Sequence, residues 1–267
     1  MIRRASLTIT AISLFCTQAF AAQPFELSLR LQNDSSAVLP AAEVCGLMPL
    51  ALDGQVRDWL LSASQPLRQS SESYCLRHGS LGPYQSQQIA VQWRPTSPLP
   101  DTAWMPAAPY DLTQFPSTQL LQLSDSFAAY PQRERVGRIY AWMVGNIAFS
   151  GIRRGIDGAE HALQVGSGDC TEHMLLAGEL LERNGVTIRR ALGVAIPKDQ
   201  HRISAVALHN WIEYFDNGSW LVFDSSKKLL GIPEEESYLA LLFYQSSQQL
   251  SHNVFSTDSP KLKLFLQ

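Results

Sequence analysis

The segment that most constrains the fold of this chain is a predicted helix that starts at Cys170 or Thr171 and stops at Asn184-Gly185. Its leucine-rich sequence places apolar residues at helical spacing, and Asn-Gly is a typical helix stop. Asp169 is a suitable N-cap, and the preceding glycine-rich stretch, residues 166–168, gives the chain a flexible approach. Cys170 is therefore expected at the N-terminus of this helix.

A helix N-terminus suits a reactive cysteine. Its unpaired backbone N–H groups and the positive end of the helix dipole favour the thiolate of Cys170, which is the nucleophilic form. The same amides can stabilise an oxyanion when the thiolate attacks a carbonyl. A buried structural cysteine is the alternative, but it does not account for the glycine-rich approach. We therefore interpret Cys170 as a nucleophile.

Residues 206–224 have the pattern of a β-hairpin, with two strands on either side of Asn217-Gly218. If these two residues form the loop, Trp211 lies opposite Asp224. His209 is two residues before Trp211, so it becomes a diagonal neighbour of Asp224 on the same face. Diagonal neighbours lie roughly 7 to 8 Å apart at the backbone, which lets a carboxylate reach an imidazole.

These three residues fit the roles of cysteine acyl-transfer chemistry. Cys170 is the expected nucleophile, His209 the general base, and Asp224 the group that orients the imidazole. A histidine alone in a strand is more often structural, so the prediction depends on the whole set. A zinc site of Cys170, His173 and His209 is a competing interpretation, but no second cysteine or close histidine pair accompanies it. We expect no metal.

The sequence resembles the transglutaminase-like superfamily, especially its bacterial exported members. The resemblance rests on residues 168–173 (Gly-Asp-Cys-Thr-Glu-His), the helix that follows, residues 209–213 (His-Asn-Trp-Ile-Glu) and residues 220–224. It spans about residues 125–230. It implies an α+β, papain-like fold in which the cysteine helix packs on an antiparallel sheet. It also implies Cys170, His209 and Asp224 as the catalytic triad, without a metal or cofactor.

Members of this family perform transamidation, amide hydrolysis or related acyl transfer, and some are inactive. The chain departs from the family pattern in Ser225-Ser226, where a small residue or proline and then threonine are usual, and in Asn210, where alanine is commoner. Neither departure removes a catalytic group.

Three other residues are candidates for substrate binding or for support of the triad. Gln164, six residues before Cys170, compares with the oxyanion glutamine of papain-like proteases. His173 is expected on the cysteine helix near the site, and Trp211 on the strand of His209.

The cysteines and the N-terminus together indicate export. Residues 1–21 have the basic start, apolar stretch and small-residue cleavage pattern of a signal peptide, which removes Cys16. We expect a periplasmic or secreted protein with no stable membrane insertion after cleavage. In an oxidising compartment the simplest pairing is Cys45 with Cys75, which leaves Cys170 free. The alternatives are three unpaired buried cysteines, or a cytosolic protein in which residues 1–21 are not a signal peptide.

Residues 22–115 are expected to form a smaller β-rich N-terminal region. Residues 25–31 alternate strictly between apolar and polar side chains, and residues 89–93 have the pattern of another short strand. Between them, residues 56–61 are predicted to form a short helix.

Residues 116–267 are expected to form the transglutaminase-like catalytic domain. The proline-rich residues 95–116 suit an extended connector to it. Residues 136–147 have apolar side chains at helical spacing, and residues 238–243 are an apolar stretch that we also expect to be helical.

Composition limits the partners. The chain has 267 residues, is 45% hydrophobic and has a formal net charge of -3, so no basic surplus points to nucleic acid. A protein or peptide substrate fits better. We therefore expect an exported, cofactor-independent cysteine enzyme that acts on amide bonds through a thioester. The alternatives are a cysteine peptidase or amidase on protein or cell-wall peptide, and an inactive transglutaminase-like binding module.

Overall fold

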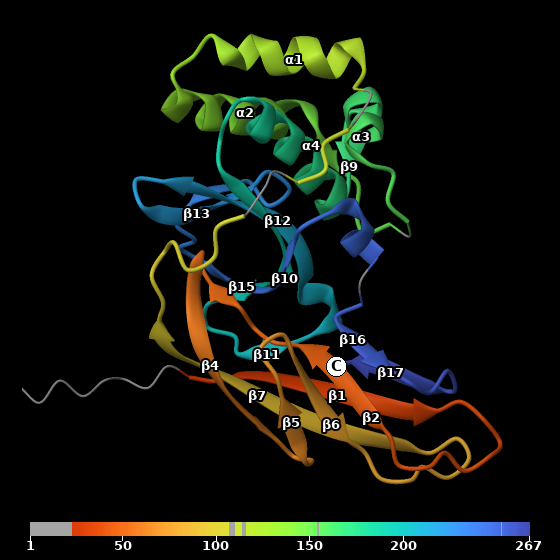
Figure 1. The fold of residues 1–267 in the computed structure, drawn as a ribbon. Helices are drawn as coiled ribbons and strands as arrows, with labels where there is room; N and C mark the ends of the chain where they lie inside the picture. Colours follow the sequence, from red (N-terminus) through yellow and green to blue (C-terminus); the bar gives the residue numbers. More distant parts are fainter. Residues whose placement is uncertain (1–22, 107–109, 114–115, 154, 252) are drawn as a thin grey trace, which may run out of the picture.

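The computed structural model describes residues 23–106, 110–113, 116–153, 155–251 and 253–267. The described residues form four α-helices and a large, mostly antiparallel sheet (Figure 1), so the predicted α+β class is confirmed. The predicted signal peptide, residues 1–21, lies outside the described residues. Among the described helices, none combines the length and the apolar character that a bilayer crossing requires.

The helices all belong to the middle of the chain: α1 (Thr118–Ala128), α2 (Gln132–Asn146), α3 (Ala159–Val165) and α4 (Cys170–Arg183). The helix expected over residues 136–147 is confirmed as α2. Two short 3-10 helices follow at Ala205–Ala207 and Ser247–Ser251.

One sheet runs through both halves of the molecule. Its spatial order is β11 (Arg202–Ile203), β1 (Phe25–Asn33), β7 (Ser86–Pro98), β4 (Gln55–Ala63), β3 (Ala51–Leu52), β15 (Glu236–Tyr244), β10 (Ile188–Pro197), β12 (Leu208–Asp216), β13 (Ser219–Asp224) and β14 (Leu229–Gly231), and β17 (Leu262–Leu266) also pairs with β1. A four-stranded sheet has the order β16 (Phe255–Thr257), β2 (Glu43–Leu47), β6 (Ser73–Arg77) and β5 (Leu67–Gln69). A parallel pair, β8 (Ala148–Phe149) and β9 (Ser167–Gly168), leads into α4.

The N-terminal strands follow the alternation of their sequence. Phe25, Leu27, Leu29 and Leu31 of β1 are all buried, because alternate side chains of a strand point to the same face. They join one hydrophobic cluster with Ile89, Val91 and Trp93 of β7, so both predicted strands are confirmed. The N-terminal region is β-rich, as expected.

Two helix predictions were wrong. Residues 56–61 lie in strand β4, where Trp59 and Leu61 are buried while Leu60 between them is 59% exposed. A short apolar run is compatible with either a helix or a strand, and the alternating burial of these residues is that of a strand. Residues 238–243 lie in β15, between β3 and β10. A central strand is covered on both faces, so its sequence is apolar throughout rather than alternating.

The predicted connector begins inside a strand. β7 continues to Pro98 and pairs with β4 as far as Arg57, with a register shift between Arg57 and Trp59. Described residues 99–106 and 110–113 then follow without helix or strand. Proline has no backbone N–H to donate to a neighbouring strand. It is tolerated at this strand end because the irregular pairing leaves some backbone positions without an interstrand hydrogen bond.

The four helices gather at one end of the molecule, above the β12–β13 hairpin (Figure 1). α4 packs on β12, α2 and α3. Its apolar residues Leu176, Leu180 and Leu181 share a hydrophobic cluster with Ile212 of β12 and Phe223 of β13. This packing places the start of α4 beside the start of β12, which are the two elements that carry Cys170 and His209.

Candidate active site

Cys170 is the first residue of α4, as predicted. Asp169 caps the helix: its Oδ1 accepts a hydrogen bond from the Thr171 N–H at 2.7 Å. Glu172 completes a capping box by accepting the Asp169 N–H at Oε2, 3.2 Å away. At Gly168 a Cβ atom would lie 2.4 Å from the Glu172 Cβ, so only glycine fits there. Glycine at position 168 therefore leaves the space that Glu172 needs to form the capping box at the start of the helix.

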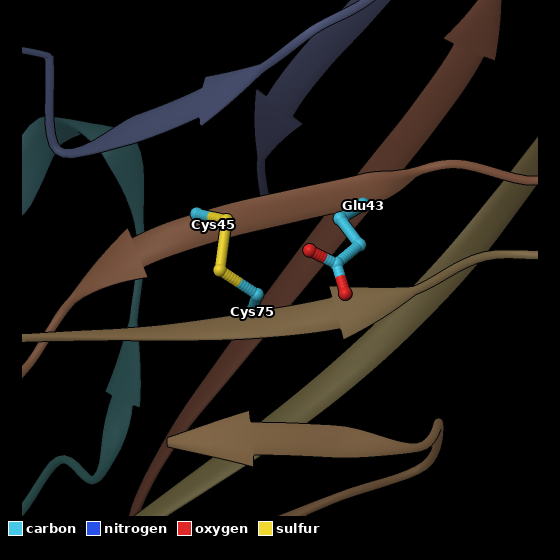
Figure 2. A group of neighbouring side chains, drawn as sticks. All are labelled: Glu43, Cys45 and Cys75. Atoms are coloured by element: carbon cyan, nitrogen blue, oxygen red, sulfur yellow. A yellow bond between two sulfur atoms is a disulfide. The ribbon is translucent and has the colours of Figure 1, made fainter. Parts of the chain in front are cut away.

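The cysteine pairing is confirmed. Cys45 and Cys75 form a disulfide between directly paired residues of β2 and β6, and Cys170 is a free, buried thiol. Figure 2 shows Glu43 beside the disulfide. The two sulfur atoms are bonded to each other, and the Glu43 carboxylate pairs with Arg68 at 2.7 Å. This group is therefore not available as a set of thiolate metal ligands.

The hairpin has the predicted register. Asp216 pairs with Ser219, and the pairing continues without a bulge to Ile212 opposite Phe223. Asn217 and Gly218 form the loop, both with positive φ (49° and 88°), as a two-residue type I′ turn requires. The next residues in this register are Trp211 and Asp224, which puts His209 and Asp224 on one face.

The imidazole of His209 and the carboxylate of Asp224 meet directly. His209 Nε2 donates to Asp224 Oδ2 at 2.6 Å, and both side chains are buried. This leaves Nδ1 of the ring for Cys170, which is close enough to raise the pKa of His209. The structure thus brings together all three residues of the predicted triad, in the order thiol, imidazole, carboxylate.

Protonation of His209 is favoured by its neighbours. Burial by itself lowers the pKa of His209, but the hydrogen bonds to Asp224 and Cys170 and the charges of both groups raise it to about 9. Burial of Asp224 raises the pKa of its carboxyl, and the hydrogen bond and charge of His209 outweigh this and lower it. The arrangement therefore supports an imidazolium next to a carboxylate at neutral pH.

Two of the other candidate residues lie at the site. The ring of Trp211 stacks on that of His209 with 6.2 Å between centroids. His173 is buried, and its Nδ1 is 2.8 Å from the Ser225 hydroxyl. Burial lowers the pKa of His173, so it is a neutral support behind the site. Gln164 lies on α3 with its side chain exposed.

Other polar contacts at the site were not predicted. The Asp224 carboxylate also accepts from Tyr238 Oη (2.9 Å), Ser226 Oγ (2.7 Å) and the Lys227 N–H (3.1 Å). Asn210 links Thr171 and Tyr244 through its side-chain amide. The unusual residues Asn210 and Ser226 were visible in the sequence as departures from the family pattern. Tyr238 gave no such signal, because its apolar stretch also fits a helix.

Comparison with known proteins supports the fold. The family model of the transglutaminase-like superfamily matches residues 122–225. This match covers less than half of the chain. We call the matched residues the transglutaminase-like core. This transglutaminase-like core contains Cys170, His209 and Asp224. A search of curated proteins found no match.

Solved structures of similar fold include three bacterial proteins. A candidate cysteine protease from Cytophaga hutchinsonii matches with a TM-score of 0.50 and 13% identity, over 93% of this chain and 91% of that one. The periplasmic domain of TgpA from Pseudomonas aeruginosa has a TM-score of 0.42 and 15% identity, over 76% and 88%. Calcium-bound LapG from Legionella pneumophila has a TM-score of 0.37 and 16% identity, over 49% and 81%. The first match extends beyond the transglutaminase-like core into the N-terminal strands.

Proposed function

We propose that this protein is an exported cysteine-dependent enzyme that acts on amide bonds by acyl transfer through a thioester. Cys170 is the nucleophile, His209 the general base and acid, and Asp224 the group that orients His209. The observation that carries the proposal is the buried 2.6 Å hydrogen bond between His209 and Asp224, beside the helix that begins at Cys170. The base and its orienting group are thus in hydrogen-bond reach, and the nucleophile lies on the helix packed against the strand of the base.

The reaction divides into two steps. The Cys170 sulfur attacks the amide carbonyl carbon, and His209 gives its proton to the leaving amine as the C–N bond breaks. The thioester then reacts with water or an amine, which loses a proton to His209 as the C–S bond breaks. The Cys170 backbone N–H is a candidate oxyanion donor because it lies at the first position of α4. Gln164 is the other candidate, although its side chain is exposed on α3.

The acceptor separates two variants of this proposal. Transfer to an amine makes the protein a transglutaminase-like acyltransferase, and transfer to water makes it a peptidase or amidase. The Cytophaga neighbour is described as a candidate cysteine protease, which makes hydrolysis a second proposal. Both variants use the same triad and need no cofactor, since all reacting groups are side chains.

Export is part of the proposal. A disulfide persists in oxidising compartments, so the Cys45–Cys75 bond supports a periplasmic or secreted location. Within this proposal residues 116–267 carry the reaction on a protein or peptide substrate, and residues 22–115 support them.

The decisive experiment traps the acyl-enzyme. The folded protein is incubated with a peptide mixture, quenched in acid and read by mass spectrometry, with Cys170→Ala as the control. A substrate-derived mass on Cys170 that is absent from the variant supports the proposal. Equal labelling of both proteins contradicts it. A wild-type thiol that reacts with no electrophile at any pH indicates the inactive binding module instead.

A further inference from the structure

The carboxylate of Asp224 is held by a residue from a strand outside the hairpin. Tyr238 of β15 donates its hydroxyl to Asp224 Oδ2 at 2.9 Å, and this is the same oxygen that accepts from His209. The second oxygen, Oδ1, accepts from Ser226 and from the Lys227 N–H. Each oxygen of Asp224 therefore has two donors, which fixes the carboxylate plane.

Tyr238 contacts the other members of the site through its ring. The side chain is fully buried, and its ring lies 6.3 Å from that of His209 and 5.2 Å from that of Trp211, each in an edge-to-face arrangement. Burial and the nearby Asp224 charge raise the pKa of Tyr238, so the hydroxyl keeps its proton. Tyr238 is thus a constant donor whose position is set by aromatic packing on the residues that it serves.

The N-terminal region in turn holds Tyr238. Asp53, in the turn between β3 and β4, accepts the Tyr238 N–H at Oδ1 (2.7 Å) and donates its own N–H to the Tyr238 carbonyl (2.8 Å). The carbonyl oxygen of the next residue, Gly54, accepts a hydrogen bond from the buried Arg189 guanidinium at 2.7 Å. A Cβ on Gly54 would lie 2.5 Å from the Trp220 carbonyl oxygen. This turn is therefore fitted closely against the transglutaminase-like core.

We propose that Tyr238 is a positioning residue for Asp224, and through it for His209, and that the Asp53–Gly54 turn sets the place of Tyr238. The inference rests on the proposed function for its effect on catalysis, but the hydrogen-bond relay can be tested without a substrate. This proposal gives the N-terminal region a defined role, because its Asp53–Gly54 turn holds the strand from which Tyr238 positions Asp224.

Removal of the Tyr238 hydroxyl has a predictable effect on His209. With that donor absent, Oδ2 accepts from His209 alone and attracts the imidazolium more strongly. The other titratable groups around this pair are Cys170 and His173 on α4, Tyr140 on α2 and Glu236 on β15, and none of them is changed by the substitution.

The test is Tyr238→Phe, with Tyr74→Phe as the matched control. Tyr74 is also a buried tyrosine, but it belongs to the N-terminal hydrophobic cluster. Histidine NMR titrations follow His209, with its signal assigned by His209→Gln. We expect the His209 midpoint of Tyr238→Phe to rise by about 0.5 to 1 pH unit and that of Tyr74→Phe to stay unchanged. We also expect kcat to fall about tenfold in Tyr238→Phe, with KM retained.

An unchanged midpoint in folded Tyr238→Phe overturns the inference. If instead the wild type forms no acyl-enzyme while the midpoint still shifts, the proposed function fails and the positioning relationship stands. Should Tyr238→Phe not fold, Asp53→Asn and Asp53→Gly provide the second test. Both residues accept the positive φ of position 53 (50°), but only asparagine keeps the oxygen acceptor. A midpoint that differs from wild type in the glycine variant alone supports the inference, and equal midpoints in both contradict it.

Discussion

Asn210 donates from Nδ2 to the Thr171 hydroxyl over 2.9 Å, and so joins the residue after His209 to the residue after Cys170. The same amide accepts from the Tyr244 hydroxyl at 3.1 Å. The Asn210 side chain therefore connects α4 to the sheet next to the residues that carry the thiol and the imidazole. This link has a measurable consequence.

Asn210→Ala should fold, because the Asn210 side chain is only half-buried, but it should loosen the site. We expect a loss of about 1 kcal/mol in the free energy of unfolding and a several-fold slower alkylation of Cys170 by iodoacetamide. Urea unfolding and the alkylation rate at pH 7 provide the measurements. A variant as fast and as stable as wild type shows that the amide link has no role in register.

Asp224→Asn tests the carboxylate while keeping its size. Without the negative charge, burial dominates and the pKa of His209 falls from about 9. We expect kcat/KM to fall by about a thousandfold or more, because the imidazole loses both its orientation and its proton at neutral pH. A histidine NMR titration and steady-state kinetics on the substrate found by trapping check both parts. Retention of most of the activity excludes Asp224 as the orienting residue.

The raised pKa of His209 also predicts how stability depends on pH. The ordinary histidine pKa is 6.5 and the folded-state value is about 9, so the folded state binds the proton more tightly. The resulting stabilisation is complete below about pH 6.5 and disappears as the pH rises through about 9; its size is roughly 3 kcal/mol at most. Urea unfolding at pH 6 and pH 9.5, in wild type and His209→Gln, measures it. The pH-dependent difference should be smaller in the variant.

Removal of the disulfide should affect stability and leave the thiol chemistry unchanged. Cys45 and Cys75 are 30 residues apart, and a bond that closes such a loop contributes about 3 to 4 kcal/mol. We expect the double alanine variant to unfold at lower urea while Cys170 is alkylated at the wild-type rate. A large change in that rate would instead connect the small N-terminal sheet to the site.

The site could be predicted from the sequence because its signals are local. The N-cap Asp169 places Cys170 at the start of α4, and the Asn217-Gly218 turn with its strand register places His209 beside Asp224. Each of these two features depends on residues near one another in the sequence, whereas the packing of α4 on β12 brings the two parts together.

The contacts missed by sequence reasoning are those between distant segments. Tyr238 reaches Asp224 because β15 lies between β3 and β10, and its apolar sequence does not distinguish a doubly covered strand from a buried helix. The helix prediction for residues 56–61 was wrong for a similar reason, since their strand depends on pairing with β7. Pairing with strands that are distant in the sequence therefore determines the secondary structure of both segments.

The last strands of the chain lie beside the first ones: β17 pairs with β1, and β16 pairs with β2 (Figure 1). During synthesis, the N-terminal strands therefore emerge long before the partners that complete their edges. Until residues 255–266 are available, β1 and β2 expose unpaired backbone groups that other chains can bind. Residues 255–266 thus protect the edges of β1 and β2, and their removal would leave both edges open to aggregation.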